Sequence, residues 1–519
     1  MFLIKSKYFI GLMTCIGILV GFYERFYVAV HPIGTLTSDG ATIGLMALEI
    51  LHHHSVTAYM WGQSYGGSLE PIFDSLVFLI FGSGTAQLIF ASILASFLAT
   101  CALLFFALQI MDRRAAWFGT ILFWLWPASL IWRSTKPGGT YFIGLAVCLV
   151  ASGLFIKLIK DKANFKLSLV CGLFVGLAIW STPMSFEIFI PLCFFEIREI
   201  LKLAKALLSL LAGFFIGLSP VIYFGAFHKW SNFSPPGGGG NAVNGFLSRF
   251  VQFFTDELPL EMSLKIQRSL SWNFFDTVLY ILLGVFLLFC IFRSLRAGVS
   301  GSAAMIVIFL PFIYSANHLA DHLGQARYAM FGFSMVPLLF SFGIFEILNS
   351  FNRQEILSKS GSASKPTFAL AILCGTAILS AALAMTALAD APSNLIVGFP
   401  APDVAMPVND TQLVQALLKY HVHTAYGTYW MAYRVTFETN ESTLVTPYHF
   451  IRSRQIEKQV LSSKNPAYLF VSTSHTLGNF RSWLQRHSIK YSEINLNKFA
   501  IVIPAQNIRP ARLGKLVTD

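Results

Sequence analysis

Asp39 is the residue of this chain whose type and position are best suited to chemistry. It follows the first long apolar segment, within TSDGATIGLMALEILHHHSVTAYMWGQSYGGSLEP, residues 37–71. A positioned carboxylate can accept the proton of an attacking hydroxyl group. Asp39 or its neighbour Ser38 could equally cap the helix that follows, because both side chains accept hydrogen bonds from backbone N–H groups at a helix start. The residue types leave both roles open.

A helix is predicted directly after Asp39. Its apolar residues recur at the helical spacing i, i+3, i+4, and they are Ile43, Met46, Ala47, Ile50 and Leu51. This spacing produces one apolar face, so we expect the helix to lie on the surface of a bilayer rather than to cross it. Asp39 would then stand where a lipid-linked substrate meets water.

Two further features of the same stretch could take part in chemistry. Glu70 follows a pair of glycines and is either a second carboxylate facing Asp39 or a solvated loop residue. His52, His53 and His54 suggest a metal, but consecutive helical residues point in different directions, so at most two could share a ligand sphere. A hydrated helix end is the simpler explanation, and no metal site is predicted.

Basic residues next to two later apolar segments are candidates for binding a phosphate group. Arg133 and Lys136 lie in WRSTKPGG, and Arg327 with Tyr328 precedes another segment. We place all of them on the outer face of the membrane, where basic residues run against the positive-inside trend. Arg offers phosphate a bidentate donor and Lys a point charge. Alternatively, these side chains only extend to the membrane surface.

The elements that must hold these residues are those of a membrane protein. Of 519 residues, 55% are hydrophobic and 12% are charged, against about 25% charged in soluble domains, and the mean hydropathy is +0.63. Apolar segments of about 20 residues, or shorter ones paired around a turn, predict about eleven transmembrane helices. They are residues 8–30, 86–110, 115–132, 139–157, 166–182, 184–197, 205–225, 272–292, 302–317, 329–348 and 367–389.

The basic residues predict the orientation of these helices. With the N-terminus in the cytoplasm, Lys and Arg concentrate on the cytoplasmic connections. The residues are Lys5, Lys7, Arg113, Arg114, Lys157, Lys160, Lys162, Lys166, Arg198, Lys202, Lys205, Arg293, Arg296, Arg353, Lys359 and Lys365. The net charge of +12 is therefore explained by membrane topology, and nucleic-acid binding is not predicted. The first segment is interpreted as a retained membrane anchor rather than a cleaved signal peptide.

A transmembrane region of residues 1–390 and a tail of residues 391–519 are predicted. The region carries outer loops at 31–85 and 226–271, and a short one at 317–328. Within the second loop, SPPGGGGNAVNG is either a flap that orders over substrate or a plain connector.

The tail has the composition of a small soluble α/β domain on the outer side, large enough to bury its own core. Helices are predicted at 413–420 and 477–487. Strands are predicted at 424–426 and in RVTFET (434–439), ESTLVTP (441–447), YLFVSTS (468–474) and KFAIVIP (498–504), from their β-branched content.

Several segments occur in an order that resembles a known family. They are the outer-loop Asp that opens a helix, GQSYGGSLEP, MDRRAAWFGTILFWLWPASLIW, the short spans around LAIWSTP, and GQARYAMFGFSMVPLLF. Together they resemble the GT-C superfamily of integral-membrane glycosyltransferases, in the branch of the protein O-mannosyltransferases and lipid A aminoarabinose transferases. The resemblance covers residues 1 to about 390. The tail segment YGTYWMAYRVTFETNESTLVTP resembles the extracytoplasmic domain of some bacterial members.

The resemblance implies an inverting transferase that takes a sugar from a polyprenyl-phosphate donor and passes it to a glycan, lipid or protein acceptor. The reaction would occur on the outer face of the cytoplasmic membrane. Asp39 matches the acidic residue taken as the general base in the family. Arg327 and Tyr328 match an Arg-Tyr pair that lies near the donor phosphate, where Lys136 or Arg133 could assist.

The chain departs from the family at one position. Members often carry a second acidic residue directly after the first, but here that residue is Gly40, so a mechanism with two carboxylates would need Glu70. No nucleotide and no protein nucleophile is required, because a lipid phosphate is already a good leaving group. A divalent metal is possible, as some members use one, although no cluster of ligands demands it.

Two other functions are compatible with many membrane spans. A lipid-linked sugar flippase or transporter would show paired interrupted helices near the midplane, whereas the polar residues here gather at the outer surface. A polysaccharide polymerase or ligase would be expected to carry a large outer loop late in the membrane region, and the late loop here has about a dozen residues.

Overall fold

The computed structural model describes residues 7–31, 36–138, 140–161, 164–233, 245–264, 274–298, 300–317, 327–357, 365–389 and 409–510. The chain forms two compact units. The helical unit comprises Met1–Val28, Ile93–Ser134 and Thr140–Ala391, and the mixed unit comprises Ala29–Ser92, Thr135–Gly139 and Pro392–Asp519. The predicted architecture, a polytopic helical membrane protein with a small C-terminal α/β domain, is confirmed. The first outer loop, however, clusters with the tail.

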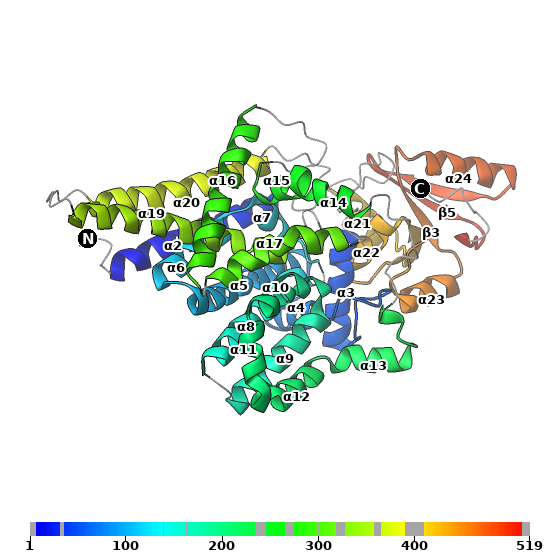
Figure 1. The fold of residues 1–519 in the computed structure, drawn as a ribbon. Coiled ribbons are helices and arrows are strands. Elements are labelled where there is room, and N and C mark those ends of the chain that lie inside the picture. The colour runs from blue at the N-terminus through cyan, green and yellow to red at the C-terminus, as the bar shows by residue number, and fades with distance from the viewer. Residues whose placement is uncertain are drawn as a thin grey trace. The chain divides into compact units, whose positions relative to one another are not determined.

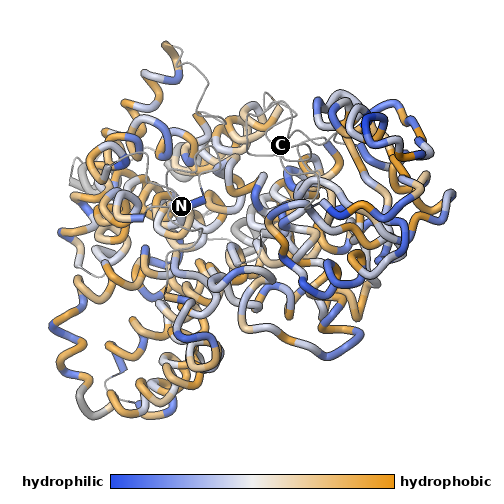
Figure 2. Tube along the Cα trace, turned by 90° about the vertical axis from the view of Figure 1, so that its right-hand side faces the viewer, coloured by the Kyte–Doolittle hydropathy of each residue, from blue (hydrophilic) through white to orange (hydrophobic). Residues whose placement is uncertain are grey.

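The helical unit is a succession of helices of very different lengths (Figure 1). They are α2 (Lys7–Val30), α5 (Thr85–Ile110), α6 (Arg113–Leu125), α7 (Ala128–Arg133), α8 (Tyr141–Asp161), α9 (Phe165–Ser181), η2 (Pro183–Ser185), α10 (Phe186–Phe195), α11 (Ile197–Ile200), η3 (Leu201–Ala206), α12 (Leu207–Gly217), α13 (Ser219–Phe227), η4 (Ser231–Phe233), α14 (Phe246–Gln252), η5 (Phe253–Glu257), α15 (Leu258–Glu261), α16 (Phe274–Arg296), α17 (Gly301–Ala316), α18 (Met330–Phe333), α19 (Met335–Leu357) and α20 (Lys365–Ala389). Figure 2 shows long apolar stretches of chain interrupted by short hydrophilic ones.

Five helices of the described residues are long and apolar enough to cross a membrane. They are Thr85–Ile110, Tyr141–Asp161, Phe274–Arg296, Met330–Ser350 and Ala369–Ala389. A sixth is reached if Ile197–Leu203 and Leu207–Gly217, which meet at 102°, form one span. Breaks divide some of the other predicted spans: the segment predicted at 115–132, for example, is interrupted between α6 and α7 by Pro127.

Helices α9 and α12 approach each other through glycines. A Cβ atom at Gly172 would lie 2.0 Å from the carbonyl oxygen of Leu210, and one at Gly213 would lie 2.0 Å from that of Leu169. The pattern repeats one turn later at Gly176 and Gly217. Each helix thus presents two glycines four residues apart to the other backbone, a close packing that membrane helices use because apolar burial does not drive their association.

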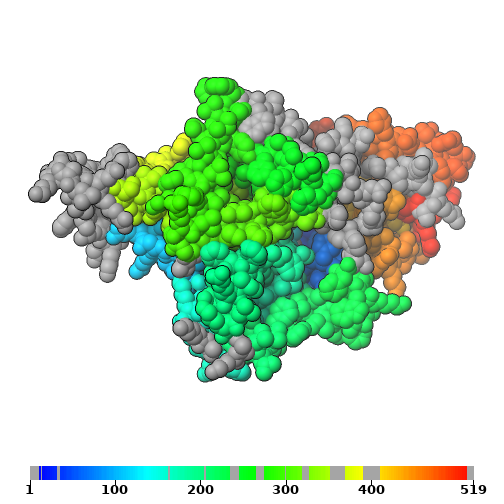
Figure 3. Space-filling model, viewed as in Figure 1, coloured from blue at the N-terminus to red at the C-terminus, as the bar shows by residue number. Residues whose placement is uncertain are grey.

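Helix α16 has a mostly apolar surface that the other described residues leave largely uncovered. Only 11% of its most apolar 18-residue window is buried, and Phe274 and Phe275 at its start are 77% and 80% exposed. The green residues of this part of the chain form much of the face seen in Figure 3. An apolar helix surface of this kind is suited to lipid.

The mixed unit combines helices of the first outer loop with the α/β elements of the tail. Its elements are α3 (Ser38–His53), α4 (Leu69–Phe81), α21 (Thr411–Lys419), β1 (Thr424–Gly427), α22 (Tyr429–Glu438), β2 (Leu444–Pro447), α23 (Arg454–Ser462), β3 (Ala467–Val471), α24 (His475–Arg486), β4 (Tyr491–Asn495) and β5 (Phe499–Pro504). The strands form one sheet in the order β2-β1-β3-β5-β4. The pairs β2-β1 and β1-β3 are parallel, and β3-β5 and β5-β4 are antiparallel.

Both faces of this sheet are apolar and covered. In β3, Leu469 belongs to a cluster with residues of α21 and α22. Its neighbours Tyr468 and Phe470 belong to a second cluster with residues of α3, α23 and α24. Successive side chains of a strand point to opposite faces, so β3 contributes to a core on each side of the sheet.

Helix α3 lies in the second of these cores rather than on a bilayer surface. Residues 40–48 are buried throughout, and a Cβ atom at Gly44 would lie 2.6 Å from the ring of Phe437 in α22. The helix was predicted correctly, but its expected surface position is wrong for these residues. Residues of α3 outside the predicted apolar face, such as Gly44 and Leu48, are also small or apolar. Other parts of the protein can therefore enclose the helix.

Helix α22 of the tail differs from the prediction for its residues. RVTFET (434–439) was expected to be a strand, but it forms the end of helix α22. Buried Arg434 binds Asp410 (2.7 Å) and Glu438 (3.1 Å), a pairing across one helical turn that a strand would separate. The predicted helices at 413–420 and 477–487 and the other predicted strands are present, whereas α23 and β4 were not predicted.

Two loop predictions fall largely outside the described residues. The run SPPGGGGNAVNG, proposed as a flap or a connector, lies at 234–245, of which only Gly245 is described. In the late loop at 317–328, Asn317, Arg327 and Tyr328 are described.

Candidate functional site

The start of α3 is capped by Thr37, which leaves Asp39 free of that task. The Thr37 hydroxyl accepts a hydrogen bond from Gly40 N (3.1 Å). Ser38 donates instead to the backbone oxygen of Tyr429 (2.5 Å). The interpretation of Ser38 or Asp39 as the helix cap is therefore wrong.

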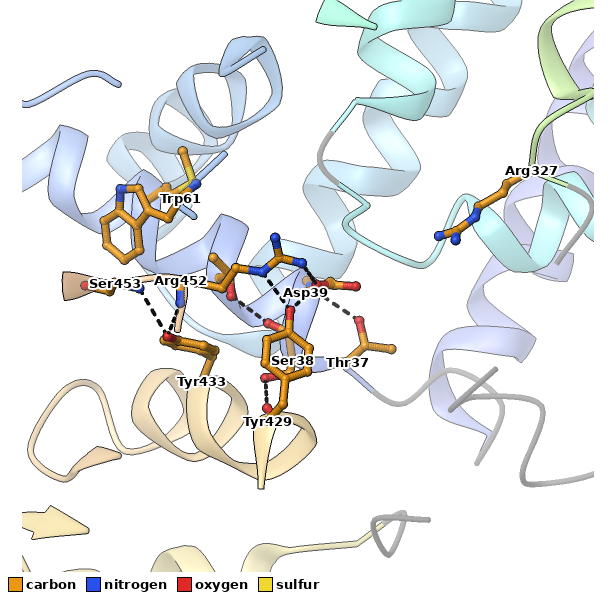
Figure 4. A network of polar contacts seen from close by, with 12 residues as sticks. Thr37, Ser38, Asp39, Trp61, Arg327, Tyr429, Tyr433, Arg452 and Ser453 are labelled. Carbon is orange, nitrogen blue, oxygen red and sulfur yellow. Dashed lines mark hydrogen bonds and ion pairs between the residues drawn. The ribbon is translucent and has the colours of Figure 1, made fainter. Parts of the chain in front are cut away.

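The Asp39 carboxylate binds two side chains of the tail (Figure 4). The Tyr429 hydroxyl donates to Asp39 Oδ1, and Arg452 Nη2 donates to the same oxygen at 3.2 Å. Arg452 Nε donates to the Tyr429 hydroxyl at 3.1 Å. The Asp39 side chain remains 38% exposed, so a reactant can still reach this carboxylate.

Local structure explains why these two residues reach Asp39. Tyr429 begins α22, the helix predicted as a strand near its end, and α22 packs on α3. Arg452 lies in the loop between β2 and α23, where Tyr433 accepts hydrogen bonds from Arg452 N (2.6 Å) and Ser453 N (3.1 Å). Neither Tyr429 nor Arg452 was predicted as a partner of Asp39. The available signal was the helical spacing of Tyr429, Tyr433 and Phe437.

The GQSYGG turn packs on the loop that carries Arg452. Gly62 has a φ of +68°, which favours glycine. A Cβ atom there would lie 2.9 Å from the Arg452 Cα atom. Position 62 therefore favours glycine for two reasons: its backbone is left-handed, and the backbone of Arg452 lies close to it.

Both partners of Asp39 stay hydrogen-bond donors over a wide pH range. Burial, followed by the charge of Asp39, raises the pKa of Tyr429. Burial acts to lower the pKa of Arg452, but Tyr429 and Asp39 outweigh it, so this pKa lies above its usual value. The phenol therefore remains neutral and the guanidinium remains charged.

The Lys136–Pro137–Gly138 segment contacts both Gly40 and Glu70. A Cβ atom at Gly40 would lie 2.9 Å from the Pro137 oxygen, so the position directly after Asp39 has no room for a side chain. Glu70 is 4% exposed and accepts a hydrogen bond from Gly138 N (3.1 Å). Its interpretation as a solvated loop residue is therefore wrong.

Asp74 lies one turn after Glu70 on α4 and is 1% exposed. Burial, with the charge of Glu70 as a second cause, raises the pKa of Asp74 well above its ordinary value.

In the helical unit, two of the predicted phosphate-binding residues meet at one tyrosine. Arg327 Nη1 donates to the Tyr141 hydroxyl (3.4 Å), and the Arg133 guanidinium lies 4.9 Å from the centre of the Tyr141 ring. The Arg327 guanidinium lies 4.7 Å from the ring of Tyr328. Lys136, at 6% exposed, belongs to the mixed unit.

The histidines at 52–54 form the end of α3. His53 pairs with Glu49 (3.0 Å), and His54 has a left-handed conformation that ends the helix. The described residues contain no group of three or more His, Cys, Asp or Glu that could hold a metal ion. The divalent metal that the family resemblance allows therefore finds no fitting ligand set here.

Solved structures share this arrangement of elements. ArnT from Cupriavidus metallidurans in the apo state aligns over 96% of this chain and 98% of that chain, with a TM-score of 0.60 and 11% sequence identity. The same protein bound to undecaprenyl phosphate aligns over the same shares with a TM-score of 0.58. The Archaeoglobus fulgidus oligosaccharyltransferase in the apo form aligns over 90% of this chain and 70% of that chain, with a TM-score of 0.52 and 14% identity.

The chain has the GT-C fold. The resemblance inferred from Asp39 and the later segments is thus confirmed at the level of architecture. No protein-family model and no curated protein sequence matches the chain. At 11% to 14% identity, the GT-C likeness establishes the fold, and the chemistry of this GT-C chain must be argued from its own residues.

Proposed function

We propose that this protein is an inverting glycosyltransferase that moves a sugar from a polyprenyl-phosphate donor to a hydroxyl group of a glycan, lipid or protein acceptor. The observation that carries the proposal is Asp39, an accessible carboxylate that the fold holds by one oxygen in a GT-C chain. Glycosyl transfer is the chemistry that the names of the similar structures indicate, and one of those structures contains a lipid phosphate.

The proposed reaction is a single displacement at the anomeric carbon. The acceptor hydroxyl attacks that carbon while its proton passes to Asp39. The bond from the anomeric carbon to the phosphate oxygen breaks, and the lipid phosphate leaves with the electron pair. Because the nucleophile enters opposite the leaving group, the configuration at this carbon inverts.

Charge that develops on the leaving phosphate needs a cation. Arg327 and Arg133, gathered at Tyr141, supply fixed positive charge for this purpose, and Lys136 is a further candidate. Tyr328 lies beside Arg327 and shields one side of its guanidinium from water. Glu70 is proposed as the second carboxylate. We place the reaction on the outer face of the cytoplasmic membrane, from the distribution of basic residues.

The test is sugar transfer by purified full-length protein from a panel of polyprenyl-phosphate sugars, comparing wild type with Asp39→Asn. We expect wild type to transfer one donor sugar, and the variant to lose about 10²- to 10⁴-fold in kcat, the usual contribution of a general base. Since Thr37 caps the helix, the variant should keep its thermal stability.

Glu49→Gln is the matched control, because Glu49 lies on the same helix and its side chain pairs with the exposed His53. It should transfer sugar at the wild-type rate. Equal turnover by wild type and Asp39→Asn would remove Asp39 from the mechanism. Absence of transfer from every donor, with movement of intact lipid-linked sugar across vesicles, would favour a flippase instead.

A further inference from the structure

Both donors from the tail bind the same oxygen of Asp39. Tyr429 and Arg452 donate to Oδ1, whereas no hydrogen bond from the described part of the chain goes to Oδ2. A carboxylate held by two donors on one oxygen cannot rotate freely about its Cβ–Cγ bond. Its second oxygen then has a defined direction.

We infer that Tyr429 and Arg452 are positioning residues of the transferase, which orient Asp39 so that Oδ2 accepts the proton of the incoming hydroxyl. The inference rests on the proposed function and extends it, because it assigns part of the active site to the C-terminal tail. The tail would thus be required for chemistry, in addition to any role in recognising the acceptor.

The two positioning residues are themselves fixed at several points. The Ser38 hydroxyl donates a hydrogen bond to the backbone oxygen of Tyr429. The Tyr433 hydroxyl accepts hydrogen bonds from the backbone N–H groups of Arg452 and Ser453. The close contact of Gly62 with Arg452 leaves that loop little space to move. A carboxylate supported in this way satisfies the requirement that reacting groups be oriented before the substrate arrives.

The two positioning residues keep the protonation states that their contacts with Asp39 require. Tyr65, from the GQSYGG turn, is another titratable group that interacts with Arg452. Because Tyr429 stays protonated and Arg452 stays charged, neither group should itself cause a transition in activity near neutral pH.

The same contacts would have the opposite consequence if they withheld Asp39 from the substrate. A purely inhibitory contact would occupy the carboxylate, so removal of this contact would increase turnover. The two possibilities predict changes of opposite sign, which kinetic constants can separate.

The experiment uses full-length Tyr429→Phe, Arg452→Gln and Arg452→Lys. Tyr429→Phe keeps the ring and removes only the hydroxyl donor. We expect kcat to fall about tenfold to a hundredfold in Tyr429→Phe and Arg452→Gln, with the donor KM unchanged, because misorientation of a reacting group has costs of this order.

The Arg452→Lys variant separates orientation from charge. A lysine keeps the positive charge but not the two-point contact, so kcat should remain as low in Arg452→Lys as in Arg452→Gln, again with KM unchanged. A merely structural role would not lower kcat with KM unchanged in this pattern.

Arg454→Gln is the control, because Arg454 lies two residues further on, is 83% exposed and pairs with Glu457. It should behave as wild type. Variants of Tyr429 and Arg452 with wild-type or higher kcat would overturn the inference while leaving the transferase intact. A wild type that transfers no sugar would overturn the proposed function, and this inference with it.

Discussion

At the scale of single residues, the glycine after Asp39 has a steric cause. A Cβ atom at Gly40 would lie 2.9 Å from the Pro137 oxygen. Glu70 of α4 supplies a carboxylate to the same segment, because it accepts a hydrogen bond from the N–H group of Gly138, the residue directly after Pro137. A single acidic residue at the start of α3 is therefore a consequence of packing.

This packing predicts the effect of Gly40→Ala. The added methyl group would lie 2.9 Å from the Pro137 oxygen, so backbone must move, and overpacking of this kind costs about 1–3 kcal/mol. We expect a lower thermal midpoint for the purified protein, and Gly40→Asp should lower it further.

Gly478→Ala in α24 is the matched control for Gly40→Ala. A Cβ atom at Gly478 meets no atom within 4 Å, and alanine favours a helix interior by about 1 kcal/mol over glycine. Its midpoint should stay the same or rise. If both glycine variants behave alike, the close contact with Pro137 is not present in solution.

At the scale of elements, glycine again decides how two helices meet. The reciprocal contacts of α9 and α12 join backbone to backbone at Gly172, Gly176, Gly213 and Gly217. Neither helix is strongly amphipathic in sequence, so hydropathy alone does not reveal their contact faces. Small residues at a spacing of four are the signal that does.

Replacing one of these glycines should separate the helices. Gly213→Val would place side-chain atoms within 2.0 Å of the Leu169 oxygen, which no rotamer change can relieve. We expect a clear loss of thermal stability in detergent. Gly284→Val in α16, where a Cβ atom meets open space, should cause a much smaller change, and equal losses in the two variants would contradict the close packing.

At the scale of the whole molecule, the first outer loop and the tail form one unit. They share an apolar core in which Leu45 and Leu48 of α3 join Tyr468 and Phe470 of β3. Two segments separated by more than 300 residues must therefore lie on the same side of the membrane. The orientation proposed from the basic residues places this side outside the cytoplasm.

Membrane topology can be measured with single cysteines in a variant without native cysteines. Val56→Cys and Phe450→Cys lie at positions that are 53% and 81% exposed, and both should react with a membrane-impermeant thiol reagent added outside. Lys202→Cys, at an exposed position of a predicted cytoplasmic connection, should react only after permeabilisation. Reaction of residues 56 and 450 from opposite sides would contradict a common unit.

Local sequence patterns were enough to predict the class of fold and to propose Asp39 as the centre of the chemistry. Apolar segments of membrane-spanning length, basic connections and the position of Asp39 are properties of local sequence, and each is readable because the bilayer and the helix impose fixed lengths and spacings. The strands at 424–426 and 498–504 were also predicted correctly, because their residue types favour the strand conformation that they adopt.

Only the tertiary structure decided what surrounds Asp39. Tyr429 and Arg452 come from the tail, about 400 residues away in the chain, and local patterns carry no information about such pairings. The β-branched residues near 434–439 favoured a strand, and packing of α22 against α3 and the sheet overrode that preference. The burial of α3 likewise depended on a partner surface. An apolar helix face indicates that something must cover it, but the sequence of the helix does not show which segment does so.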